Sequence, residues 1–132
     1  MTTGLPVWVA LTAGPDGNLL SPIEMRQIAE RCVGAGASAV LVNCTPASVT
    51  HRYVETLAVA SLGVPIGAYA NAGQADEKIG WSVDDPPNPT EAAARYLACA
   101  QQWTDRGATI IGGCCGTGPH HIAAIARWLA SD

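Results

Sequence analysis

Four short apolar segments alternate along the chain with stretches in which apolar residues recur at helical spacing. The segments are almost continuously apolar, a pattern typical of strands in a parallel sheet that is covered on both faces. They span residues 6–12, 38–43, 65–70 and 109–113. Because a helical pattern follows each segment, the predicted order is βαβαβαβα, which indicates an α/β protein with an essentially parallel sheet.

The predicted helix starts carry strong local signals. Residues 21–24 (SPIE) and 88–91 (NPTE) each combine a capping residue, a proline at the first helical position and a glutamate at the third. Proline also opens the other two predicted helices, at 45–46 (TP) and 118–119 (GP). These starts leave residues 71–88 as the longest connection, and connections of this length are usually functional or mobile.

The number of strands limits the architecture. A (β/α)₈ barrel takes roughly 250 residues, whereas this chain has 132. Four βα units therefore form either a small open α/β sheet or half of a barrel that must cover its two edges with a partner. We interpret residues 1–132 as a single domain, a half-barrel of four consecutive βα units, and expect a homodimer to complete the barrel.

The two halves of the chain also share an internal sequence similarity. Residues 6–14 resemble residues 65–73, and residues 36–44 resemble residues 107–115. Two βαβα units explain this similarity, and so does the general likeness of all βα units. If the repeat is genuine, it places Cys44 and Cys115 at equivalent strand ends.

Composition excludes several functional classes. With 48% hydrophobic and 14% charged residues, the chain has enough apolar content for a core and is unlike a disordered protein. A net charge of −4 with only 7 Lys and Arg argues against a nucleic-acid or membrane partner. Residues 1–4 lack signal-peptide features, and the odd number of cysteines, 5, excludes a complete intrachain disulfide framework. We therefore expect a cytoplasmic protein in a reducing compartment.

Cysteines follow two of the predicted strands, where the functional face of a parallel α/β sheet lies. Cys44 follows the second strand, and Cys114 and Cys115 follow the fourth. Adjacent side chains of a regular strand point to opposite faces, but the glycines around the pair allow the backbone to aim both sulfurs inward. Three thiolates suit a zinc ion with an open fourth position, as in catalytic sites. The alternatives are buried free cysteines and, for the adjacent pair, a vicinal disulfide.

Three segments resemble the zinc-dependent homocysteine S-methyltransferases: VLVNCTP (40–46), YANAG (69–73) and IIGGCCGTGPHHI (110–122). Their order and separations match the C-terminal half of that family's (β/α)₈ barrel. The resemblance implies that Cys44, Cys114 and Cys115 bind Zn²⁺, and that Asn43 and Asn71 line a homocysteine pocket. It also implies methyl transfer to the homocysteine thiol from a donor such as S-methylmethionine, S-adenosylmethionine, betaine or a methylated cobalamin or folate.

The chemistry of that role is coherent. A free thiol is mostly protonated at pH 7, and coordination to zinc deprotonates it. A zinc-bound thiolate therefore attacks a methyl donor without a separate general base, so we predict no catalytic residue beyond the metal site.

The remaining candidates lie outside the cysteine motifs. Trp81 lies in the long connection, which forms either a lid with Trp81 on the ligand or a surface excursion held down by Trp81. His120 and His121 are interpreted as a solvated helix start, with the mouth of the site as the alternative, and His51 as a surface residue. Cys32 and Cys99 fall among apolar residues of predicted helices, so we expect them in the core.

Two alternatives to a methyltransferase remain open. The family's N-terminal half, which completes its pocket, has no counterpart in these 132 residues. The first alternative is therefore a zinc- and thiol-binding half-barrel that is not catalytic by itself, either as a binding module or as a subunit that needs a separate partner carrying the N-terminal half. A purely structural oligomer is the third possibility.

Overall fold

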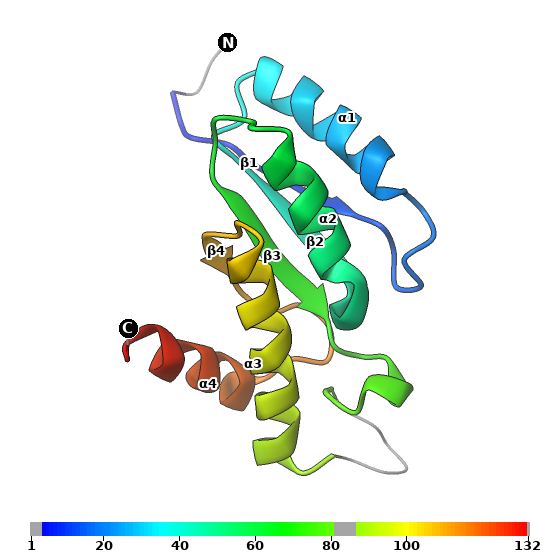
Figure 1. The fold of residues 1–132 in the computed structure, drawn as a ribbon, viewed down its shortest axis with the longest axis vertical. Coiled ribbons are helices and arrows are strands. Elements are labelled where there is room, and N and C mark those ends of the chain that lie inside the picture. Colours follow the sequence, from blue (N-terminus) through cyan, green and yellow to red (C-terminus); the bar gives the residue numbers. More distant parts are fainter. Residues whose placement is uncertain (1–3, 81–86, 132) are drawn as a thin grey trace.

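A four-stranded parallel sheet with the strand order β1-β2-β3-β4 forms the centre of the computed structural model, which describes residues 4–80 and 87–131 (Figure 1). A helix follows each strand, so the predicted βαβαβαβα order is confirmed. The strands are β1 (Trp8–Thr12), β2 (Ala39–Pro46), β3 (Ile66–Asn71) and β4 (Ile110–Ile111). The helices are α1 (Pro22–Gly34), α2 (Ala47–Val59), α3 (Pro89–Asp105), α4 (Pro119–Leu129) and the short 3₁₀ helix η1 (Ala75–Glu77).

The main core lies between the sheet and its helices. Alternate residues of β2 and β3 face the helices, and they join the buried apolar side chains of α1, α2 and α3 in one cluster. Trp103 and Tyr96 are the largest fully buried side chains of this cluster, and their rings meet edge to face at 5.4 Å. The strand residues of the cluster are Val40, Val42, Ile66, Ala68 and Ala70.

The other sheet face carries the alternate residues of the same strands. Trp8 pairs in register with Ala39 at one end of this face, and Asn43 pairs with Tyr69 at the other. Trp8 is 58% exposed. In the described part of the chain the helices lie along one side of the sheet (Figure 1), as expected for half of a barrel.

All four strands differ from the predicted boundaries, β3 by only one residue at each end. β2 continues past Asn43 to Pro46, and β1 begins at Trp8 rather than at Pro6. Of the predicted strand at residues 109–113, only Ile110 and Ile111 pair regularly with β3, because the glycines that follow them leave the regular ladder. Backbone bonding to β3 nevertheless continues, from Gly112 N–H to the Ala68 carbonyl. None of the described helices is long and apolar enough to span a membrane.

Candidate metal centre

Cys44 lies in a bulge within β2. The pairing of β2 with β3 shifts register between Asn43 and Pro46, and Cys44 has a φ of +46°, in the left-handed region. The fully buried Thr45 holds this bulge, since its hydroxyl accepts from Ala13 N–H and donates to the Asn43 carbonyl, both at 3.1 Å. Strained backbone of this kind is typical of functional sites. From this bulge the Cys44 side chain reaches the segment that follows β4.

Cys114 and Cys115 lie on a tight turn between β4 and α4. Cys114 N–H donates to the Ala70 carbonyl of β3, and Ala72 N–H donates to the Cys115 carbonyl at 2.7 Å. The Thr117 hydroxyl closes the turn by donating to the Cys114 carbonyl at 2.7 Å. These bonds fix the backbone of both cysteines against the end of β3.

The three thiols meet in one cluster. The Sγ atoms of Cys44 and Cys115 are 3.7 Å apart, those of Cys114 and Cys115 are 3.9 Å apart, and all three lie within 4.8 Å of one another. A tetrahedral zinc ion with Zn–S bonds near 2.3 Å separates its sulfurs by about 3.8 Å. The spacing and the soft donor set therefore fit zinc, and Cys115 is exposed, which leaves an approach to a fourth position.

The electrostatics of the cluster favour a cation between the thiols. Burial, together with hydrogen bonding and repulsion from the other two thiols, raises the pKa of Cys44 to about 12. Without a cation, the Cys44 thiol therefore stays protonated at neutral pH, whereas a bound metal ion stabilises its thiolate. All five cysteines are free thiols. Cys32 and Cys99, expected in the core, are half-buried on α1 and α3.

The predicted substrate residues differ in what surrounds them. Asn43 lies next to the cluster, and its Oδ1 is buried with no hydrogen-bond partner among the described residues. Asn71 is 7% exposed, and its Oδ1 accepts from Gly73 N–H at 2.7 Å. This atom therefore helps to shape the described part of the connection that follows, residues 72–80, which we call the loop after β3. Trp81 lies outside the described residues.

Tyr69 is a residue that the sequence analysis missed. It pairs in register with Asn43, on the sheet face away from the main core. Burial raises the pKa of its hydroxyl, and repulsion from Cys114 and Cys44 adds to this. Side chains two positions apart in a strand lie on the same face. Because Tyr69 precedes Asn71 by two positions, the sequence spacing alone could have indicated that it shares a face with Asn71.

The interpretation of both histidines as a solvated helix start is wrong for His121. His120 is exposed, but His121 is 2% exposed and hydrogen-bonded at both ring nitrogens. His121 faces inwards, because its Nε2 lies 2.8 Å from the carbonyl oxygen of Ile79 in the loop after β3. The two ring centroids lie 3.9 Å apart with the ring planes tilted by 38°, and both rings line a cavity of about 230 Å³. His51, interpreted as a surface residue, is half-buried on α2.

The loop after β3 packs tightly against the turn that carries Cys114 and Cys115, called the cysteine turn below. A Cβ at Gly116, which has a φ of +79°, would lie 2.6 Å from the Ala72 carbonyl carbon. A Cβ at Gly80 would lie 2.1 Å from the Ala72 carbonyl oxygen and 3.0 Å from the Gly116 Cα. Three backbone segments therefore touch directly beside Cys115, and only glycine fits at both positions.

Comparisons with known proteins give a consistent result. Homocysteine S-methyltransferase 2 of Zea mays is 30% identical over 130 residues, which is 95% of this chain and 36% of the relative. A homocysteine S-methyltransferase of Bacillus subtilis is 36% identical over 110 residues, 82% of this chain and 30% of the relative. A selenocysteine methyltransferase of Astragalus bisulcatus is 30% identical over 129 residues, 96% of this chain and 37% of the relative.

A solved structure shows the same fold. The apo homocysteine methyltransferase MmuM from Escherichia coli matches 79% of this chain and 32% of its own, with a TM-score of 0.56 and 25% identity. The chain thus spans about a third of the length of the relatives it matches. The family model for homocysteine S-methyltransferases matches residues 1–129, and the chain belongs to that family.

Proposed function

We propose that the protein is a zinc-dependent S-methyltransferase for homocysteine or a closely related thiol. The spacing of the Cys44, Cys114 and Cys115 sulfurs carries this proposal, because it suits a tetrahedral ion with one free position. A bound zinc ion supplies the positive charge that keeps an incoming thiol in its thiolate form at neutral pH. The need for reduced thiols fits a cytoplasmic location.

The chain's own residues hold and orient the substrate in this proposal. The three cysteines bind the metal at the carboxyl ends of the strands, and exposed Cys115 marks the side from which a thiol enters. The Asn43 side chain offers an Oδ1 that has no hydrogen-bond partner among the described residues, and Tyr69 pairs with Asn43 on the same sheet face. Asn71 shapes the adjoining loop, and we propose that Trp81 packs over the ligand from the connection that follows.

We further propose that a second copy of the chain covers the open face and edges of the sheet. Leu5, Val7 and Trp8 are 73%, 53% and 58% exposed at the β1 edge, which is an apolar surface suited to a partner. A pair of chains would bring together eight parallel strands and two cysteine clusters. The same open face favours the second candidate, a zinc- and thiol-binding subunit that is active only with a partner supplying the family's N-terminal half.

One set of measurements separates these proposals. The reduced protein is prepared anaerobically, its mass is measured by light scattering, and its zinc content is measured by plasma mass spectrometry. Methylation of homocysteine is then followed by mass spectrometry with a panel of methyl donors. Stoichiometric zinc with turnover supports the enzyme, and a dimer mass supports its assembly from two copies. Stoichiometric zinc without turnover favours the second candidate, and zinc well below one per chain contradicts both.

A further inference from the structure

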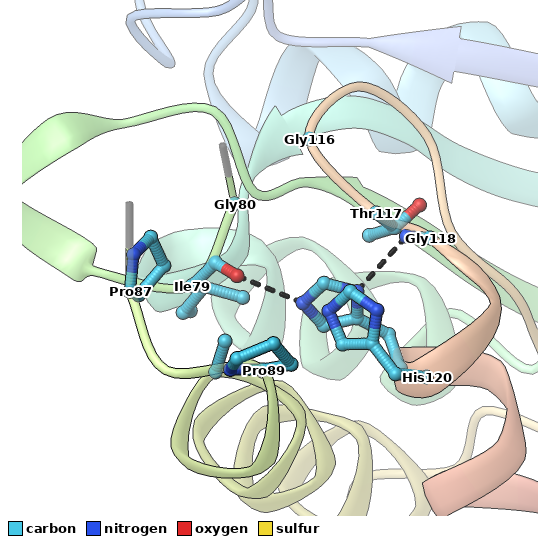
Figure 2. Close-up of a pocket in the computed structure, with 10 residues that line it drawn as sticks. Ile79, Gly80, Pro87, Pro89, Gly116, Thr117, Gly118 and His120 are labelled. Atoms are coloured by element: carbon cyan, nitrogen blue, oxygen red, sulfur yellow. Dashed lines mark hydrogen bonds between the residues drawn. The ribbon is translucent and has the colours of Figure 1, made fainter. Parts of the chain in front are cut away.

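The hydrogen bonds of His121 define its protonation state. Nδ1 accepts from the Gly118 N–H at the start of α4 (2.9 Å), and Nε2 lies 2.8 Å from the Ile79 carbonyl oxygen (Figure 2). A carbonyl only accepts and a backbone N–H only donates. Both bonds form together only in the neutral ring that carries its proton on Nε2. A second proton, on Nδ1, would face the Gly118 N–H and break that bond.

The surroundings of His121 hold the ring in this orientation. The Tyr96 ring contacts it edge to face at 5.6 Å, and the tilted His120 ring lies 3.9 Å away. Burial lowers the pKa of His121, and the neighbouring His120 adds to this effect, so the neutral form is favoured. The ring is therefore a fixed link between α4 and the loop after β3, which lies 42 positions away in the chain.

That link ends beside the cysteine turn. Ile79 is buried and immediately precedes Gly80, whose backbone lies against Ala72 and Gly116. Gly116 directly follows Cys115, and the Ala72 N–H holds the Cys115 carbonyl. A shift of residues 79–80 away from α4 would remove the support on which this turn rests.

We propose that His121 is a positioning residue of the cysteine site: its Nε2–H bond to Ile79 holds the loop against the turn that carries Cys114 and Cys115. Its Nδ1 has the separate task of capping α4. The proposal rests on the proposed function, since the turn matters here as a holder of metal ligands. Replacing groups that hydrogen-bond directly to metal ligands changes metal affinity by about 10- to 100-fold, and His121 acts on the ligands through Ile79 and the turn.

Two substitutions separate the two bonds. His121→Asn keeps an acceptor near the Nδ1 position but cannot reach Ile79, whereas His121→Gln keeps a donor near the Nε2 position and loses the cap. Glu24→Ala is the matched control, because the Glu24 carboxylate accepts from the Ser21 N–H in the same capping position of α1, at 2.8 Å. Each full-length protein is titrated with Co²⁺ against a competing chelator, its thiolate absorption bands are recorded, and its thermal stability is measured.

His121→Asn is expected to weaken Co²⁺ binding by about 10-fold or more and to alter the absorption bands. His121→Gln and Glu24→Ala are expected to lose stability while Co²⁺ affinity stays within about threefold of the parent. Equal Co²⁺ affinity in the parent and His121→Asn would overturn the proposal. An effect of His121→Gln as large as that of His121→Asn would overturn it as well.

Amide hydrogen exchange of the metal-free protein keeps this test independent of the proposed function. Faster exchange of the Ala72 N–H in His121→Asn than in Glu24→Ala supports the positioning role even if the parent binds no metal. Unchanged exchange overturns it. Imidazole nitrogen shifts in the parent check the tautomer directly, and a proton on Nδ1 at neutral pH contradicts the proposal.

Discussion

The Cys44 and Cys115 sulfurs lie 3.7 Å apart although 71 positions separate the two residues in the chain. The parallel sheet brings the two residues together, because β2 and β4 both pair with β3 and their carboxyl ends lie on the same side of the sheet. The bulge at Cys44 and the turn at Cys114 and Cys115 then remove the strand alternation that would keep the sulfurs apart. The fold thus creates a site for a soft metal ion from segments that are remote in sequence.

Removal of one thiol is the most direct test of the metal site. Cys115→Ser leaves two thiolates with a poor third ligand, so zinc affinity is expected to fall by at least about 100-fold. Chelator competition and metal content after dialysis measure the change. Cys32→Ser, on α1 and outside the cluster, is the control and is expected to keep the parent's zinc content. Full zinc occupancy in Cys115→Ser would show that these thiols do not form the site.

The close packing beside Cys115 gives a second prediction. Gly116→Ala introduces left-handed strain and a Cβ at 2.6 Å from the Ala72 carbonyl carbon, so the free energy of unfolding is expected to fall by about 3 kcal/mol or more. Gly63 has a similar φ of +72° with nothing within 4 Å of the added Cβ. Gly63→Ala is therefore expected to lose only about 1–2 kcal/mol. Urea denaturation of both variants measures the difference, and equal losses would contradict the packing argument.

Local sequence patterns were sufficient for the order of the elements. Proline at the first helical position and a capping Ser or Asn are properties of neighbouring residues, and α1 and α3 begin where they predict. The meeting of Cys44 with Cys114 and Cys115 also followed, because strand ends in a parallel sheet share one edge. These expectations needed no knowledge of contacts between distant residues.

Contacts between distant residues account for what the sequence did not reveal. His121 looks like any polar residue at a helix start, and its burial depends on Ile79, 42 positions earlier. The bulge at Cys44 depends on the Thr45 hydroxyl reaching Ala13, 32 positions earlier. Tyr69 falls in a predicted strand that is almost continuously apolar, and only its place in the register puts it beside Asn43.

Tyr96 supports the site from the helix side of the sheet. Its hydroxyl proton is shared between the carbonyl oxygens of Ala70 and Gly112, at 3.2 and 3.0 Å, where β3 and β4 end. Tyr96→Phe leaves the ring packing and removes these bonds, so we expect a loss of about 1–2 kcal/mol of stability and weaker Co²⁺ binding.

Tyr53→Phe is the matched control for that change. The Tyr53 hydroxyl makes a similar bond to the Leu20 carbonyl at 2.9 Å, away from the cysteines. It is expected to lose similar stability and to keep the parent's Co²⁺ affinity. If Tyr96→Phe and Tyr53→Phe bind Co²⁺ equally well, the Tyr96 bonds contribute to stability alone.

The pH dependence of folding tests the buried neutral state of His121. Burial lowers its pKa from 6.5 in the folded protein, so below that pH the unfolded chain binds a proton that the folded chain does not. The free energy of unfolding is therefore unaffected by this group above pH 6.5 and falls as the pH drops below it. The slope from this one group is at most about 1.4 kcal/mol per pH unit.

His121→Asn removes this titration, and comparing it with the parent cancels the contributions of the other groups. Urea denaturation of the metal-free, reduced proteins from pH 8 to about pH 5 is expected to show a shallower loss of stability in the variant. His120→Asn, which replaces the exposed neighbour, is expected to keep most of the parent's slope. If His121→Asn and the parent lose stability in parallel, His121 takes up its proton equally in both states, and the two hydrogen bonds do not hold it neutral.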